Sequence, residues 1–101
     1  MIELYQAEWC PHSHRVRQRL TELGLDFVAR QVPADRAERD AMERATGGRS
    51  IPALVFAEGD VVAGDDDIVA ALDRRFSEPA SAAMHRLKAI EEWPEWLRLA
   101  H

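Results

Sequence analysis

The order of periodic segments in the first third of the chain constrains its fold most strongly. Residues 1–5 alternate between apolar and polar side chains, which predicts a short strand. Cys10-Pro11 opens a predicted helix, because proline is favoured in a first helical turn, and Gly24 ends it. One face of this helix is apolar through Val16, Leu20 and Leu23. Residues 26–32 are rich in β-branched and aromatic side chains and predict a second strand, so the chain begins as strand, helix, strand.

The next segments extend this α/β pattern. Residues 34–45 are charged, with small apolar side chains at helical spacing, and predict a half-exposed helix ended by Thr46-Gly47-Gly48. Residues 51–57 and 61–63 flank a short turn containing Gly59 and predict a hairpin. Three aspartates at 65–67 then begin a predicted third helix, where acidic side chains suit the helix dipole. The expected fold class is α/β, with a small four-stranded mixed sheet flanked by helices in the order βαβαββα and an extra C-terminal helix.

Chain length and composition predict one folding unit with a helical extension. At 101 residues and 47% apolar content the chain is large enough for one core and too small for two. We expect the main domain over residues 1–76, a linker at 77–81 and a C-terminal helical extension over 77–101 that packs on the same domain. Its apolar face comprises Met84, Leu87, Ile90, Trp93 and Trp96. The alternative is a helix that docks a partner or a second copy.

Composition also narrows the class of function. No apolar run approaches the roughly 20 residues of a membrane span, and residues 1–5 lack the basic start of a signal peptide, so we expect a cytoplasmic protein without membrane contact. A net charge of −5 argues against nucleic acid as a partner. The single cysteine excludes an internal disulfide, so redox chemistry requires a second thiol from outside the chain.

That cysteine, Cys10, is either a buried small apolar residue or a nucleophile. Helix N-termini and nearby cations lower the pKa of a thiol, and Cys10 precedes a helix that carries several arginines. Ser13 lies one turn further on, where its hydroxyl is expected to reach the sulfur. Pro11 and His12 complete the predicted surroundings of the thiolate, whereas His14 is expected to point away. We therefore predict that Cys10 is catalytic.

Three motifs resemble those of a known family. Cys10-Pro11-His12-Ser13 resembles a C-P-x-C motif whose second cysteine is replaced by serine. Residues 46–52 resemble T-G-x-x-T-V-P, and residues 63–68 resemble G-G-x-D-D-L. In this order they resemble the glutaredoxin family, with a similar likeness to the N-terminal domain of glutathione transferases. The resemblance covers about residues 1–76 and implies a thioredoxin fold.

The resemblance also implies an activity and a binding site. It implies a one-thiol oxidoreductase that uses glutathione as co-substrate to remove glutathione from mixed disulfides, with Cys10 and Ser13 in the catalytic motif. Ile51-Pro52 would be a cis peptide whose Ile51 backbone pairs with glutathione, or otherwise an ordinary trans proline at a strand edge. Arg49 would bind the glycine carboxylate, and Asp65 and Asp66 the γ-glutamyl end; the alternatives are a surface arginine and a helix cap.

The implied partners are glutathione or another small thiol and proteins that carry glutathione or disulfides, and we expect a monomer with a role in redox homeostasis. Three differences from the family pattern leave alternatives open. Ala7 replaces a frequent lysine, and Pro11-His12 differs from the C-G-F-S form of cluster-carrying members. Gly64-Asp65 replaces the Glu/Gln-Ser of transferases. No metal is expected for the main prediction. The alternatives are a glutathione-ligated dimer holding a [2Fe–2S] cluster and a transferase-like glutathione-binding protein.

Overall fold

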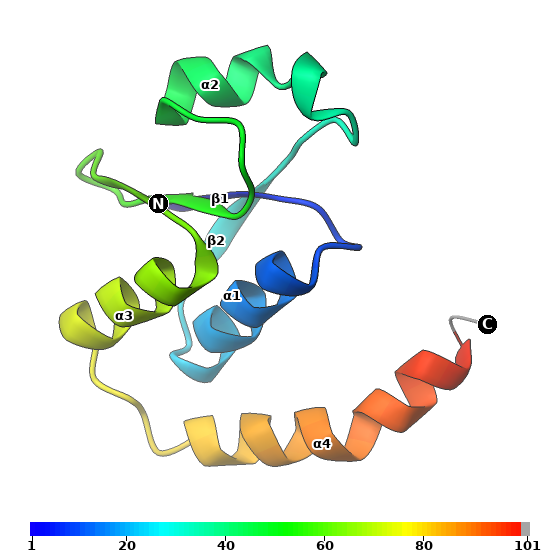
Figure 1. The fold of residues 1–101 in the computed structure, drawn as a ribbon. Coiled ribbons are helices and arrows are strands. Elements are labelled where there is room, and N and C mark those ends of the chain that lie inside the picture. The colour runs from blue at the N-terminus through cyan, green and yellow to red at the C-terminus, as the bar shows by residue number, and fades with distance from the viewer. Residues whose placement is uncertain (100–101) are drawn as a thin grey trace.

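The computed structural model describes residues 1–99 and has helices on both sides of one sheet (Figure 1). In chain order the elements are β1 (Ile2–Gln6), α1 (Pro11–Glu22), β2 (Phe27–Gln31), the 3₁₀ turn η1 (Arg36–Glu38), α2 (Asp40–Thr46), β3 (Ala53–Val55), β4 (Val61–Ala63), α3 (Asp65–Arg75) and α4 (Ala82–Leu99). The predicted order βαβαββα with an additional C-terminal helix is therefore confirmed.

The register of the sheet brings three chain segments to one edge. The strand order is β2-β1-β3-β4, with β1 parallel to β2 and antiparallel to β3, and β3 antiparallel to β4. Tyr5 lies opposite Ala53, and Ala53 opposite Ala63. The end of β1, the start of β3 and the end of β4 therefore lie together. The loop that leads to Cys10 and the first turn of α3 begin at this same edge.

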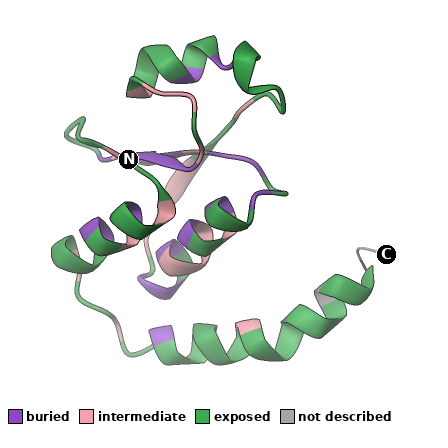
Figure 2. Ribbon diagram, in the orientation of Figure 1, coloured by how far each residue is buried: buried purple, intermediate pink, exposed green. Residues whose placement is uncertain are grey.

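The hydrophobic core lies between the sheet and the helices α1 and α3. Figure 2 shows the buried residues concentrated in β1, α1 and α3. The apolar face predicted for α1 is confirmed, since each of its members is buried. The core cluster comprises Ile2, Leu4, Val16, Leu20, Leu23, Leu54, Phe56, Ile68, Ala71 and Leu72. It fixes α1, and with it Cys10, against the sheet.

The helix predicted over residues 34–45 is divided in two, so its predicted extent was wrong. Arg39 separates η1 from α2 with a backbone outside the helical region. Its buried guanidinium donates hydrogen bonds to the carbonyl oxygens of Pro33 at 2.8 Å, Ala34 at 3.1 Å and Arg49 at 2.9 Å. These hydrogen bonds pair the loop carbonyls and so help to hold a segment that has few buried apolar side chains. Arg39 thus organises both sides of α2.

The strand predicted over residues 51–57 is shorter, because β3 comprises only Ala53–Val55. The Ile51–Pro52 peptide bond is cis, as the resemblance implied. Proline has no N–H to donate to a strand ladder, which accounts for the late start of β3. At the other end, Phe56 N–H donates to the Asp60 carbonyl at 2.9 Å and begins the turn to β4.

The predicted packing of the C-terminal extension is only partly correct. α4 contacts α1, and Ala82 at its start is buried. Met84, Leu87 and Ile90 are nevertheless exposed, and Figure 2 shows α4 as mostly exposed. The helix bends in its second half, where Pro94 removes a backbone donor (Figure 1). The side chain of Trp96 lies outside the described part of the structure. Within residues 1–99, no helix has the length and apolarity needed to cross a membrane.

Gly64 provides a test of the junction between β4 and α3. Its backbone has φ +88° and ψ +139°, a conformation that residues with a Cβ rarely adopt. Replacing Gly64 with alanine is expected to lower the free energy of unfolding by about 1–3 kcal/mol, measured by urea denaturation. Gly48→Ala is the matched control, because Gly48 has no positive φ and open space around its Cα. Equal effects of the two substitutions would contradict a backbone requirement at Gly64.

Candidate active site around Cys10

Cys10 is the N-cap residue of α1, as the sequence predicted. Its Sγ accepts a hydrogen bond from the backbone N–H of Ser13 at 3.4 Å, and Pro11 occupies the first turn. The sulfur therefore lies at the positive end of the helix dipole. The cysteine is only 6% exposed, so the protein covers most of its surface.

Ser13 supports this arrangement through its backbone rather than through its hydroxyl. The sequence predicted a contact between the hydroxyl and the sulfur, but the contact to Sγ comes from the Ser13 N–H. The Ser13 Oγ instead accepts a hydrogen bond from the Ala7 N–H at 3.5 Å, and the residue is fully buried. Ser13 thus connects α1 to the loop that precedes Cys10.

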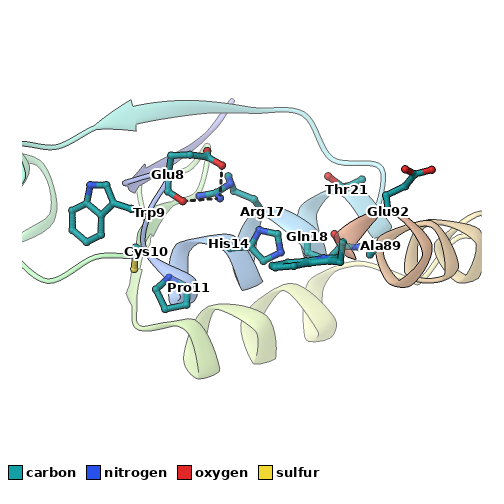
Figure 3. Close-up of a pocket in the computed structure, with 11 residues that line it drawn as sticks. Glu8, Trp9, Cys10, Pro11, His14, Arg17, Gln18, Thr21, Ala89 and Glu92 are labelled. Atoms are coloured by element: carbon teal, nitrogen blue, oxygen red, sulfur yellow. Dashed lines mark hydrogen bonds and ion pairs between the residues drawn. The ribbon is translucent and has the colours of Figure 1, made fainter. Parts of the chain in front are cut away.

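Arg17 holds the other side of that loop. Its guanidinium donates to the Ala7 carbonyl at 3.4 Å and the Glu8 carbonyl at 3.5 Å, and it also bonds the Gln6 side-chain oxygen. A further contact of 3.3 Å joins it to the Glu8 carboxylate, drawn as a dashed line in Figure 3. The segment before Cys10 is therefore tied to α1 at several atoms, which limits the movement of the sulfur.

The N-termini of α1 and α3 are joined by a small charged cluster. The Asp65 carboxylate lies 3.2 Å from His12 Nδ1 and 3.0 Å from the Arg15 guanidinium. Arg15 also pairs with Asp66. The hydrogen bond from Arg15, and after it the one from His12, lowers the pKa of Asp65. Asp65 and Asp66, the residues implied to bind the γ-glutamyl end of glutathione, thus lie in the first turn of α3. Both are paired with Arg15 of α1, the helix that Cys10 caps.

Arg49 forms its hydrogen bonds and ion pairs with α2 and the turn before it. Its guanidinium contacts the Glu43 carboxylate at 2.8 Å, pairs with Asp40 and donates to the Ala37 carbonyl at 2.9 Å. The bond to Glu43, then that to Asp40, raises the pKa of Arg49. A carboxylate ligand would have to compete with these partners. Pro52, by contrast, lies at the sheet edge near the start of α3, where its carbonyl accepts a hydrogen bond from Gly64 N–H at 3.0 Å.

A pocket of about 910 Å³ opens beside Cys10, between α1 and α4 (Figure 3). It is lined by Glu8, Trp9, Cys10, Pro11, His14, Arg17, Gln18, Thr21, Ala89, Glu92 and Trp93. The sequence prediction missed this pocket. The signal was present, since Pro11, His14, Gln18 and Thr21 recur at helical spacing on a face of α1 that does not face the sheet.

His14 anchors α4 at this pocket. Its ring meets the Trp93 ring edge-on, with the two centroids 4.6 Å apart and an interplanar angle of 89°. The expectation that His14 points away from the sulfur is compatible with this position, because the ring contacts Trp93 of α4. Burial, and then the charge of Arg17, lowers the pKa of His14 below its ordinary value of 6.5.

The lowered pKa of His14 predicts a pH-dependent contribution to stability. The unfolded chain binds a proton at His14 more readily than the folded one, so this contribution is present above pH 6.5 and is lost as pH falls through the folded-state pKa. The free energy of unfolding, measured in urea at a series of pH values, should decline more steeply below pH 6.5 in the wild type than in His14→Gln. Parallel profiles would contradict a partly buried, neutral His14.

Comparison with known proteins identifies the family. The glutaredoxin family model matches residues 2–62. Glutaredoxin 3 of Escherichia coli K12 is 31% identical over 74 residues, covering 73% of this chain and 87% of that protein. A probable glutaredoxin of Synechocystis is 36% identical over 70 residues, covering 68% of this chain and 78% of that protein. The chain belongs to the glutaredoxin family.

Solved structures extend the similarity into the C-terminal region. A rice glutathione transferase, solved in complex with glutathione, matches with a TM-score of 0.67 and 29% identity over 87% of this chain and 42% of its own. A transferase from Rhodospirillum rubrum matches with a TM-score of 0.65 and 26% identity, over 88% and 43% of the two chains. This chain spans less than half the length of these transferases. The thioredoxin-like fold implied by the sequence is confirmed.

The described residues contain no group of three or more His, Cys, Asp or Glu side chains arranged to hold a metal ion. The sequence contains one cysteine, Cys10, and its thiol is free. This thiol belongs to a residue that also lines the pocket between α1 and α4.

Proposed function

We propose that this protein is a one-thiol oxidoreductase that removes glutathione from mixed disulfides. The Cys10 thiolate attacks the glutathione sulfur of the mixed disulfide, a bond forms between the two sulfurs, and the substrate disulfide breaks. The departing thiolate takes a proton from solvent. The thiolate of a second glutathione then attacks the glutathione sulfur held on Cys10, which yields oxidised glutathione and returns Cys10 to the thiolate.

The observation that carries this proposal is the hydrogen bond from the Ser13 N–H to Cys10 Sγ at the N-terminus of α1. Such a position stabilises a sulfur anion both when it attacks and when it leaves. Membership of the glutaredoxin family supports the same chemistry. A serine at the fourth motif position cannot resolve the mixed disulfide, so the cycle needs an external thiol, as found in a reduced cytoplasm.

The binding of glutathione is proposed for residues at the shared sheet edge. Ile51 would pair with the peptide backbone of glutathione beside the cis bond to Pro52, and Arg49 would bind the glycine carboxylate. Asp65 and Asp66 would receive the γ-glutamyl ammonium after exchanging their contacts with Arg15. Pro11 and His12 would border the sulfur. The register of β1, β3 and β4 supports this grouping, because it brings these segments to the edge from which Cys10 emerges.

A steady-state assay tests the proposal. The protein is mixed with the mixed disulfide of glutathione and mercaptoethanol, reduced glutathione, glutathione reductase and NADPH, and oxidation of NADPH is followed. Turnover above the rate without protein is expected. No rate above this background, from protein that circular dichroism shows to be folded, would contradict the proposed activity.

The motif serine provides a further prediction. Ser13→Cys places a second thiol one helical turn from Cys10, where the Ser13 backbone already contacts Sγ at 3.4 Å. After mild oxidation this variant should form an intramolecular disulfide, seen in the intact mass as a loss of two hydrogen atoms, whereas the wild type should not. Reduced protein of both forms is the control. Failure of the variant to lose its free thiols would contradict the placement of residue 13 beside the sulfur.

A second candidate is a transferase-like protein that binds glutathione without turnover. The observation that favours it is the structural similarity to transferases over 87–88% of the chain, which includes part of α4. Glutathione affinity that survives Cys10→Ser, without turnover by the wild type, would support this candidate. A third candidate is a [2Fe–2S] cluster held between two chains. Visible absorbance of the wild-type protein after anaerobic purification would support it, because such a cluster absorbs visible light.

A further inference from the structure

We infer that the pocket between α1 and α4 binds the departing thiol of the mixed disulfide and selects small-molecule thiols that carry an aromatic ring. This inference rests on the proposed function and adds to it the class of substrate. The pocket is lined partly by α4, which lies beyond the residues 2–62 matched by the family model. The selectivity would therefore be specific to chains with this helix.

The location of the pocket assigns it to the departing thiol rather than to glutathione. Cys10 and Pro11 line it, so it extends to the turn that carries the reacting sulfur. None of the residues proposed for glutathione lines it: Arg49, Ile51, Pro52, Asp65 and Asp66 are all absent from its wall. A mixed disulfide has two halves joined at the sulfur atoms, and Cys10 borders both regions. The half that is not glutathione consequently has this pocket available.

The wall of the pocket favours an uncharged, aromatic occupant. Trp9 and Pro11 lie at the Cys10 end, and Ala89 and Trp93 contribute apolar surface from α4. Figure 3 shows Trp9 at the opposite end of the group from Ala89. Flat apolar rings pack favourably against aromatic side chains, in stacked or edge-on arrangements. Trp93 already makes one such edge-on contact with His14.

The charged residues around the pocket are neutralised by partners within the protein. The Glu8 carboxylate lies 3.3 Å from the Arg17 guanidinium, and the Glu92 carboxylate lies 3.8 Å from the Lys88 ammonium. A charged ligand would therefore meet no uncompensated opposite charge from Glu8, Arg17 or Glu92. A volume of about 910 Å³ also lies within the range of roughly 300–1,000 Å³ typical of small-molecule sites. These features favour a small aromatic thiol over a peptide segment.

The reaction itself is unchanged by this assignment. Cys10 Sγ forms a bond with the glutathione sulfur, the disulfide of the substrate breaks, and the aromatic thiolate leaves and takes a proton from water. Binding of the ring holds the disulfide beside Cys10 before attack, which raises kcat/KM for aromatic substrates.

Two substrates matched in leaving-group chemistry test the inference. The first is the mixed disulfide of glutathione with benzyl mercaptan, and the second is that with mercaptoethanol. Both departing thiols sit on saturated carbon, so their acidities are similar and do not dominate the comparison. The wild type is expected to show a kcat/KM about tenfold higher for the benzyl substrate, in line with discrimination by an apolar pocket.

Substitutions in α4 locate the selectivity. Ala89→Trp fills the pocket and should abolish the preference for the benzyl substrate, measured as the ratio of the two kcat/KM values. Ile90→Trp is the matched control, because Ile90 is the next residue on α4, is 73% exposed and does not line the pocket. The control should keep the wild-type preference. Trp93→Ala removes an aromatic wall and should also reduce the preference, which provides a second test if Ala89→Trp does not fold.

The outcomes separate the inference from the function on which it rests. Equal kcat/KM for both substrates in the wild type, with ordinary turnover, would overturn the inference and leave the proposed function standing. A preference that persists in both Ala89→Trp and Trp93→Ala would also overturn it, since the ring would then bind elsewhere. Absence of turnover with either substrate would overturn the proposed function and the inference together.

Discussion

Replacement of Cys10 with serine is expected to lower turnover of a glutathione mixed disulfide by about a thousandfold or more. A hydroxyl remains protonated at neutral pH and is a poor nucleophile toward sulfur, even at the N-terminus of α1. The substitution is small, and Ser retains the ability to cap the helix, so the protein should stay folded. The measurement is NADPH oxidation in the coupled assay, at matched protein concentrations.

The control experiment for this variant is a test that it remains folded. Circular dichroism and the urea midpoint of Cys10→Ser should remain close to those of the wild type, because the N-cap and the Ser13 N–H contact can both be kept. Turnover retained within tenfold by a folded Cys10→Ser protein would contradict a nucleophilic role for Cys10. In that case Cys10 would be a buried structural residue.

The largest expected effect on stability is that of Leu20→Ala. Leu20 is fully buried in the core between α1, α3 and the sheet, and its truncation should lower the free energy of unfolding by about 2–5 kcal/mol. The cost has two parts, the lost transfer of the side chain from water and the cavity that remains. Urea denaturation monitored by circular dichroism measures it.

Leu87→Ala is the matched control, since it removes the same atoms from an exposed position on α4. Its effect should stay within about 0.5 kcal/mol. A loss at Leu87 as large as that at Leu20 would show that the exposed face of α4 is buried in solution, for instance against another molecule. That result would contradict the arrangement of α4 described above.

Local patterns predicted the fold where packing and periodicity agree. The apolar face of α1 and the acidic start of α3 follow directly from helical spacing and the helix dipole, and both elements lie where they were expected. Residues 34–45 were misjudged because their apolar face is weak. There the backbone follows the hydrogen bonds of Arg39 to three carbonyls that lie 5, 6 and 10 residues away in the sequence, and helical periodicity does not encode such contacts.

The candidate site was predicted only in part, for a similar reason. The placement of Cys10 and Pro11 depends on the first turn of one helix and can be derived locally. The pairing of Arg15 with Asp65 and Asp66 joins residues about 50 positions apart and requires the assembled sheet. The pocket depends in addition on the packing of α4 against α1, because residues of both helices line it. The sequence predicted that this helix exists, but its Met84 and Ile90 do not face the domain as expected.

Detection of glutathione covalently bound to Cys10 is the direct test of the one-thiol mechanism. The wild-type protein is mixed with the glutathione–mercaptoethanol disulfide in the absence of reduced glutathione, quenched with acid, and examined by intact-mass and peptide mass spectrometry. One glutathione is expected on the peptide containing Cys10 and none on Cys10→Ser, and the adduct should be released when reduced glutathione is added. A wild-type protein that forms no adduct, or an adduct that reduced glutathione does not release, would contradict the one-thiol mechanism.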